Sequence, residues 1–319
     1  IFLLHNSSGK LNGVKESIFM ENIKDYSGRW RWNMVNDFRP QSIEYSGIKC
    51  YPTANYVNYY GMQNGYPIND MTKADAESGY DPTHPWKNRD PRFYKTIMFD
   101  GVKWKSTGGA GGTAELFTGG RESEEANEKK GCFTAYMNSK LCPQLMNTVD
   151  GYKENNIMIL SLMRLADVYL MYAEATAVGY NGPKGKAATY SLTAEEALNK
   201  IRERAGVAPV LDKFLGSTAD FLSELRRERA VELSFEGFRF IDLRRWMLLT
   251  QYPYTLKTKI EFDRADPSDY NYDEPEENAI KNLREVVLLE RKYTDRHYWY
   301  PLPKKDVSMY EGFYQNPGW

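Results

Sequence analysis

The chain has 319 residues, of which 41% are hydrophobic and 27% charged, an ordinary balance for a globular protein that can bury a large core. Its formal net charge is -1 and its isoelectric point is near 6.4, so it lacks the basic excess expected of a nucleic-acid-binding protein. Because no run of eighteen apolar residues occurs, no transmembrane helix is predicted.

The first residues, IFLLHNSSGKLNG, have no initial Met, no basic segment and no small-residue cleavage site. They therefore do not form an intact signal peptide, and we interpret the opening as cut from a longer chain. Behind it, residues 16–23 (ESIFMENI) are predicted to form a strand.

Residues 24–70 combine loop-forming sequence with a high density of aromatic rings. Large rings fill a core where the backbone is irregular, and this is one interpretation. The alternative is that some rings are platforms for a sugar or another flat ligand, with Asn and Asp nearby for hydroxyl contacts. The candidate platforms in this region are Trp30, Trp32, Tyr56 and Tyr66.

Residues 78–104 contain three prolines, which are expected to prevent a helix. The alternating side chains of residues 93–99 predict a strand. Trp86 stands between Pro and Lys on a predicted loop and is the fifth candidate platform. The charged residues that follow are interpreted as an ion-pair group that holds the fold: Arg89, Asp90 and Arg92.

Residues 108–114 contain a nominal G-x-G-x-x-A pattern, but the polar, glycine-punctuated sequence behind it has no helical periodicity. A dinucleotide-binding turn needs a helix there, so this interpretation is rejected and a surface loop is predicted.

The three cysteines, Cys50, Cys132 and Cys142, form no C-x-x-C pair, and only three widely separated histidines accompany them. A zinc site is therefore not expected. Cys132 and Cys142 could close a short disulfide loop in an oxidising compartment, and whether they pair stays open.

Two antiparallel helices are predicted in the middle of the chain. Residues 157–178 place their apolar side chains at three- and four-residue spacing, and Thr193 with Glu196 supplies a capping box for a second helix that ends at Gly206. Small residues mark the expected contact: Ala166, Ala173, Ala177 and Ala197. We interpret the pair as a tetratricopeptide-type scaffold.

Residues 225–246 (LRRERAVELSFEGFRFIDLRRW) are two amphipathic segments that meet at Gly237, and Ser217 with Asp220 caps the helix that enters them. Charged residues recur at helical spacing in both segments: Glu228, Glu232, Glu236, Arg239, Asp242 and Arg245. A half-buried row of acids needs cations beside it, and an Arg side chain can pair with a carboxylate through two hydrogen bonds. So many guanidinium groups would lower the pKa of these carboxyl groups, whereas a general acid needs a pKa near the working pH. The stretch is therefore interpreted as a structural ion-pair clamp, and no catalytic residue is predicted.

Past residue 246 the chain turns polar, and Asp269, Asn271 and Asp273 resemble the start of an EF-hand calcium loop. The required Gly and the final Glu are replaced by Glu274 and Ile280, so an EF-hand is excluded. A looser calcium site that uses Asp266, Asp269 or Asp273 is the alternative; otherwise no cofactor or metal is expected.

Several segments resemble, in the same order, the pattern of the SusD/RagB family, surface lipoproteins of Bacteroidetes nutrient-uptake systems. They are PTANYVNYYGMQNGYPI (52–68), NRDPRFYKTIMFDGVKW (88–104), MRLADVYLMYAEA (163–175), ALNKIRERAGV (197–207), ERAVELSFEGFRFIDLRRW (228–246) and the ending YWYPLPKKDVSMYEGFYQNPGW. The resemblance covers nearly the whole chain from about residue 16.

The resemblance implies a mostly α fold with long irregular loops, in which tetratricopeptide-type helix pairs and a few short strands form a SusD-like scaffold. We predict a loop-rich, aromatic-rich region over residues 1–150, a helix pair over 151–210, and C-terminal helices and loops over 211–319. In the family, a strand comparable to residues 16–23 lies mid-chain, so a signal peptide, a lipidated Cys and the first helical repeats are expected to be absent here. The ending QNPGW matches the family's natural C-terminus.

The resemblance also implies an outer-membrane lipoprotein on the extracellular face, attached through an N-terminal lipid anchor that this chain lacks. Such proteins capture oligosaccharides, or peptides in some members, and cap a SusC-like TonB-dependent transporter as a lid. Two other classes compete. A glycoside hydrolase needs two carboxylates at a defined separation, one with a raised pKa, and no such acid stands out here. A helical-repeat adaptor for protein partners is favoured if the aromatic residues are buried and the convex helical face is exposed.

Overall fold

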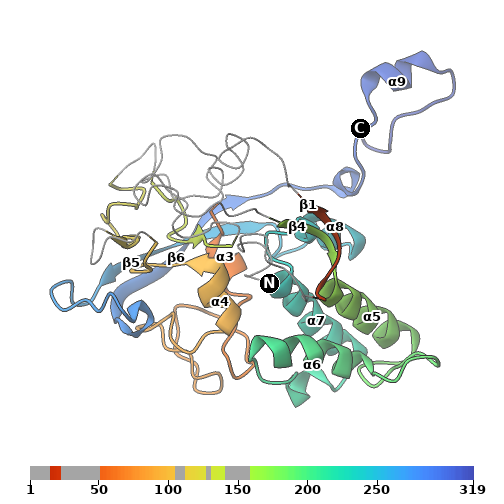
Figure 1. Cartoon of the computed structure of the whole chain (residues 1–319). Coiled ribbons are helices and arrows are strands. Elements are labelled where there is room, and N and C mark those ends of the chain that lie inside the picture. The colour runs from red at the N-terminus through yellow and green to blue at the C-terminus, as the bar shows by residue number, and fades with distance from the viewer. Residues whose placement is uncertain (1–14, 23–50, 105–111, 127–130, 141–158) are drawn as a thin grey trace.

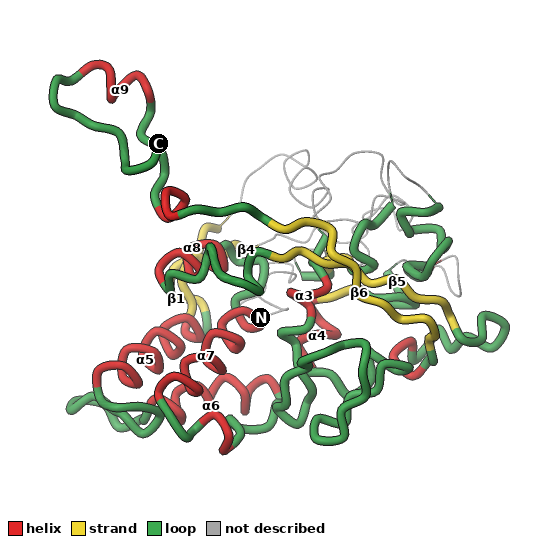
Figure 2. Tube along the Cα trace, turned by 180° about the vertical axis from the view of Figure 1, so that it is seen from behind, coloured by secondary structure: helices red, strands yellow, loops and turns green. Residues whose placement is uncertain are grey.

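The computed structural model describes residues 15–22, 51–104, 112–126, 131–140 and 159–319, and every structural statement below concerns these residues. Helices α5 (Leu165–Gly179), α6 (Ala194–Ala205) and α7 (Thr218–Glu232) lie side by side at one end of the molecule (Figure 1). A long two-stranded ribbon crosses the other end, as the view from behind also shows (Figure 2).

The helical end follows the predicted pattern of caps and small residues. The Thr193 side chain accepts a hydrogen bond from the amide of Glu196, whose carboxylate accepts one in return from the Thr193 amide, and Gly206 ends α6 in the left-handed region at φ 74°. Ser217 caps α7 by accepting from the amide of Asp220. The packed faces share one core: Ala166, Leu170, Ala173, Ala177, Ala194, Ala197, Leu198, Ile201, Val210, Phe221, Leu225 and Leu233. The predicted pair of packed helices is thus confirmed.

The start of the first helix was predicted wrongly. Strand β4 (Ile159–Arg164) occupies the beginning of the predicted helix and pairs antiparallel with β1 (Ser17–Asn22), which confirms the strand predicted near residue 16. A short apolar run has no periodicity that separates a strand from a buried helix, and its pairing partner lies some 140 residues away.

The strand predicted over residues 93–99 is also corrected. Helix α4 (Pro91–Thr96) comes first, and only Ile97–Met98 form a strand, β2, against β3 (Met137–Asn138). Pro91 occupies the first turn, where no amide donor is needed, and the Asp90 side chain caps the helix by accepting from the Arg92 amide. Proline therefore begins a helix here instead of preventing one.

Strands β5 (Leu256–Arg264) and β6 (Ile280–Glu290) form the antiparallel ribbon, in which Leu256 lies opposite Glu290. Helix α3 (Ala54–Val57) is tied to β5 because the Asn55 side chain donates to the Leu256 carbonyl at 2.8 Å. Beneath the ribbon lies a second core that is rich in rings, including Tyr60, Trp86, Phe93, Phe99, Trp104, Tyr136 and Phe262.

The chain continues from α7 through a tight turn into α8 (Phe238–Arg245). Short 3-10 turns lie before α7 at Asp212–Phe214 and after α8 at Pro275–Glu277 and Asp295–Tyr298. The C-terminal arm with α9 (Lys304–Met309) projects away from the body (Figures 1 and 2). Among the described helices none combines the length and the apolar character needed to cross a membrane. The expected fold class, a helical scaffold with irregular loops and a few short strands, is confirmed.

Candidate functional site

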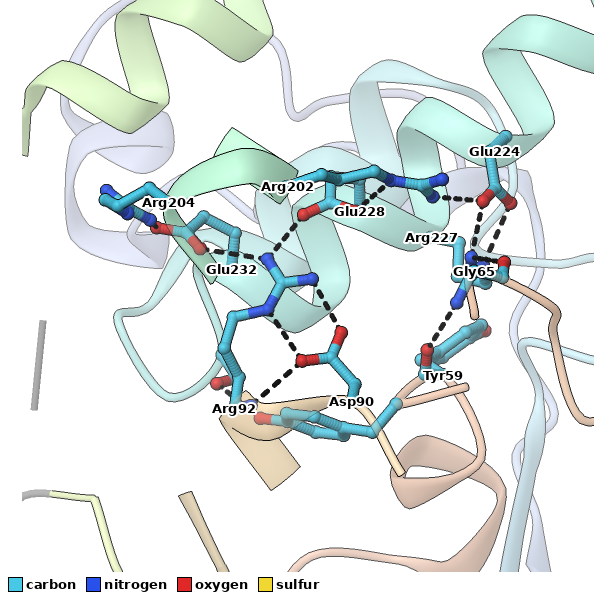
Figure 3. Close-up of polar contacts among 12 residues, drawn as sticks. Tyr59, Gly65, Asp90, Arg92, Arg202, Arg204, Glu224, Arg227, Glu228 and Glu232 are labelled. Atoms are coloured by element: carbon cyan, nitrogen blue, oxygen red, sulfur yellow. Dashed lines mark hydrogen bonds and ion pairs between the residues drawn. The ribbon is translucent and has the colours of Figure 1, made fainter. Parts of the chain in front are cut away.

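Three carboxylates of α7, those of Glu224, Glu228 and Glu232, are buried, and each meets more than one cation (Figure 3). Glu228 accepts from Arg92 and, at 3.0 Å, from Nε of Arg202. Arg202 also donates to Glu224, which in turn holds Arg227. Burial alone would raise the pKa of Glu228, but Arg92 and Arg202 outweigh burial and lower it to about 2.

Arg227 links this row to the loop that follows α3. Its guanidinium donates to the carbonyl oxygens of Tyr59 at 3.1 Å and Gly65 at 3.0 Å (Figure 3). A Cβ on Gly61 would stand 2.8 Å from Nη1 of Arg227 and 2.3 Å from the Tyr66 carbonyl oxygen. Only glycine therefore lets the loop wrap so closely around the guanidinium.

Glu232 lies at the centre of the network. Arg92 donates to it at 3.0 Å, Arg164 at 2.6 Å, and Arg204 approaches from the solvent side. Burial opposes ionisation, but Arg164, Arg204 and Arg92 hold the pKa of Glu232 well below its usual range. A carboxyl group in this setting stays charged at neutral pH and cannot serve as a general acid.

Arg164 uses all five of its N–H donors. Nε and Nη2 donate to the two carboxylate oxygens of Glu236, at 2.7 and 2.9 Å. Nη1 donates to Glu16 and Glu232, and Nη2 also reaches the Glu232 carbonyl oxygen at 2.6 Å. Lys140 completes the group by donating to Glu236 at 2.6 Å. Because Arg164 ends β4 and Glu16 precedes β1, the network joins the strand pair to α7.

The second half of the predicted clamp divides into paired and unpaired residues. Asp242 accepts from Arg229 at 2.9 Å and Arg245 at 2.8 Å, and Arg245 holds Glu174 of α5 through two hydrogen bonds of 2.6 and 2.7 Å. Arg239 differs, because its guanidinium carbon lies over tyrosine rings and no carboxylate pairs with it in the described part of the chain.

Of the ion-pair group expected near residue 90, two members pair. Arg92 donates to Asp90 at 2.7 Å. The expectation is corrected for Arg89, whose guanidinium is buried and donates to backbone carbonyls, at 2.8 Å to Tyr60 and 2.9 Å to Pro85. It holds the loop by satisfying carbonyl oxygens that turn inward.

Trp86 does not lie at the surface. It is 0% exposed, stacks on Phe99 at 5.0 Å between ring centroids and meets the edge of Phe262 at 5.2 Å. Its indole N–H faces the Tyr136 hydroxyl at 3.4 Å. The expectation that Trp86 is a ligand platform is therefore corrected, because the loop folds its ring into the core under β5 and protein occupies both ring faces.

The remaining candidate rings have different settings. Tyr56 is half-buried, and its hydroxyl donates to the Ala230 carbonyl at 2.6 Å, so it helps to anchor α3 on α7. Tyr66 is half-buried with the Lys213 ammonium 4.3 Å from its ring centroid. Trp30 and Trp32 lie outside the described residues. Ligand stacking by these rings stays a prediction.

A cavity of about 270 Å³ opens beside the network. Its walls are Pro91, Arg92, Lys95, Thr96, Lys140, Arg204, Ala205, Val231 and Glu232. Most of the charged groups in these walls are already paired with one another. The cavity therefore presents little free charge apart from the exposed Lys95.

The described residues contain no group of three or more His, Cys, Asp or Glu side chains placed to hold a metal ion. Asp266 instead accepts from the amide and hydroxyl of Ser268, at 3.1 and 2.7 Å. Cys132 is a buried free thiol, whose pKa burial raises to about 11, while Cys142 lies outside the described residues.

The sequence prediction missed the cations that come from outside the clamp: Lys140, Arg164, Arg202 and Arg204. One signal was present, since Arg164 interrupts an apolar run and Arg202 falls on the buried face of α6. A charge at a core position implies a partner, but spacing does not identify the partner.

Taken together, the fold and the network define a helical-repeat scaffold whose buried charges serve its architecture. The chain matches the model of the SusD family over residues 15–319, and it belongs to that family. No curated protein sequence matches it.

Among solved structures, the chain is similar to a SusD-like protein from Bacteroides fragilis NCTC 9343, with 21% identity and a TM-score of 0.70 over 100% of this chain and 56% of that one. It is also similar to a SusD-like carbohydrate binding protein from the same strain, with 20% identity and a TM-score of 0.54 over 81% of this chain and 47% of that one. The chain spans about half the length of these relatives.

Proposed function

We propose that this chain belongs to a glycan-binding lipoprotein on the extracellular face of the outer membrane. It captures oligosaccharides and delivers them to a SusC-like TonB-dependent transporter, which it covers as a lid. The observation that carries this proposal is the match to the SusD family over residues 15–319. A similar solved structure is described as a carbohydrate binding protein, which supports the same class of ligand.

Binding without turnover is favoured by the state of the buried acids. Glu228, Glu232 and Glu236 all have lowered pKa values because arginine and lysine side chains surround them. Glycoside hydrolysis needs a carboxylic acid that stays protonated near neutral pH. These three carboxyl groups hold the scaffold together and are unsuited to that role.

For the ring that meets the sugar we propose Tyr66, together with Trp30 and Trp32. Tyr66 is half-buried, so part of its ring faces solvent, and Lys213 stands over it. Sugar rings stack on such aromatic surfaces, and each aromatic contact contributes about 1 kcal/mol beyond the area that it buries.

The test is affinity electrophoresis of the protein against a panel of polysaccharides, with the reducing ends assayed in parallel. We expect retarded migration in at least one gel and no release of product. Tyr66→Ala should weaken the retardation about fivefold, since one ring contact is lost. Tyr314→Ala is the control, because Tyr314 is 83% exposed on the C-terminal arm.

Release of new reducing ends would turn the proposal toward a hydrolase, and retention on peptides but on no glycan would turn it toward a peptide-binding relative. Co-purification with a large β-barrel transporter tests the lid. If glycan is bound but no such partner co-purifies from outer membranes, the proposal of glycan capture is kept and the proposal that the protein covers a transporter is rejected.

A further inference from the structure

Three cations gather where the β5–β6 ribbon begins, and we call them the cationic cluster: Arg239, Lys257 and Arg291. The Arg291 amide donates to the Thr255 carbonyl at 2.9 Å, and Lys257 lies opposite Leu289 in the register of the ribbon. Side chains alternate between the faces of a ribbon, so Lys257 and Arg291 leave the same face as diagonal neighbours. Glu290, between Leu289 and Arg291, leaves the opposite face.

Arg239 reaches this place from the first turn of α8. Its guanidinium carbon lies 4.8 Å from the ring centroid of Tyr59 and 5.5 Å from that of Tyr254. Its Nη1 is buried and has no hydrogen-bond partner among the described residues. Because a buried N–H without an acceptor is unfavourable, this group is placed for an acceptor from outside the described residues.

None of the three side chains of the cationic cluster forms an ion pair within the described part of the chain. Its members also repel each other. Burial, together with the charges of Arg291 and Arg239, lowers the pKa of Lys257 to about 8. On α7, by contrast, each of the buried carboxylates of Glu224, Glu228 and Glu232 pairs with two cations or more.

The cluster is also open to solvent. Arg291 is exposed, and Lys257, Arg239, Tyr59 and Tyr254 are each partly exposed. Arg291 donates to the Tyr293 hydroxyl at 3.1 Å, which leaves most of its fork free. An anion can therefore reach three positive charges that are already held in position by tyrosine rings and by the ribbon.

We propose that the cationic cluster binds an anionic substituent, a carboxylate or a sulfate ester, on the oligosaccharide that this protein captures. Arginine forks match the two oxygens of such a group, and the tyrosines hold Arg239 in place without neutralising it. This inference rests on the proposed function and narrows its substrate class to acidic glycans.

The test is isothermal titration at low salt with trigalacturonate, with a sulfated trisaccharide and with the neutral galactotriose. The acidic ligands should bind more tightly than the neutral one, and their affinity should fall as salt is added. Lys257→Gln and Arg291→Gln should each weaken acidic binding about tenfold, the loss of one charge-assisted hydrogen bond, and leave neutral binding unchanged. Inorganic sulfate should compete with both acidic ligands.

Lys281→Gln is the matched control, because it removes the same charge from an exposed position at the far end of the same ribbon. Melting temperatures of all variants establish that they fold. If the Lys257 variant does not fold, the Arg291 variant carries the test, because Arg291 is exposed. Equal binding of acidic and neutral ligands, or equal effects of Lys257→Gln and Lys281→Gln, overturns the inference while glycan capture stands. Binding of no glycan at all overturns both.

Discussion

The ion-pair network on α7 and the cationic cluster on the ribbon both contain Arg and Lys side chains, but these side chains are paired with acids only in the network. In the network, Glu228, Glu232 and Glu236 are buried, and every one is matched by several cations. In the cluster, neither Arg239 nor Lys257 forms an ion pair within the described residues. Matched charge stabilises a fold only as a complete set, whereas unmatched charge at a surface is available to a ligand.

The largest effect should come from breaking the network at its centre. Arg164→Met leaves Glu232 and Glu236 buried without the guanidinium that they share, and should lower the free energy of unfolding by about 3–5 kcal/mol. Urea denaturation measures this. Lys200→Met, which breaks the exposed pair with Glu203, should change stability by less than about 0.5 kcal/mol. Equal losses in the two variants would mean that the network does not stabilise the fold.

A smaller effect should follow from titrating the network. The folded pKa of Glu228 is about 2, below its usual 4.5, so the stabilisation is present above pH 4.5 and is lost as pH falls toward 2. The free energy of unfolding should therefore drop steeply over this range. Glu228→Gln should cost on the order of 2 kcal/mol at pH 7 and flatten the slope. The same slope in both proteins would assign the acid sensitivity to other groups.

The smallest effect should have the opposite sign. Lys257 has a folded pKa of about 8, below its usual 10.5, so its charge destabilises the fold below pH 8, and the penalty disappears as pH rises toward 10.5. Lys257→Gln should therefore raise the free energy of unfolding at pH 7 by about 0.5 kcal/mol, because it removes a partly buried charge that also faces two like charges. Chemical denaturation at pH 7 and pH 10 measures it, and Lys281→Gln is again the control. A loss of stability would show that Lys257 has a partner and that the cluster is balanced.

Local patterns predicted the elements whose cause is local. The capping box of Thr193 and Glu196 and the stop at Gly206 depend on residues a few positions apart, and both are observed. The clamp is a similar case, since Glu228 and Glu232 are one helical turn apart and face the same way. The division of the chain at residues 150 and 210 stays a prediction.

The failures share a different cause. Strand β4 needed β1 beside it, and Trp86 needed Phe99 and Phe262 from other segments before its burial could be inferred. The ribbon of β5 and β6 was not predicted. Strand pairing is a contact between distant residues, and the sequence of each strand alone indicates it only weakly.

The sequence by itself determined the helix caps, the row of carboxylates and the family to which the chain belongs, because each is written in residues that are neighbours along the chain or in motifs of fixed order. Only the tertiary structure decided which cations pair with those carboxylates and which rings are buried. It also decided that Arg239, Lys257 and Arg291 lie together without forming an ion pair among the described residues. Electrostatic pairing and burial depend on distances through space, and the fold alone sets those distances.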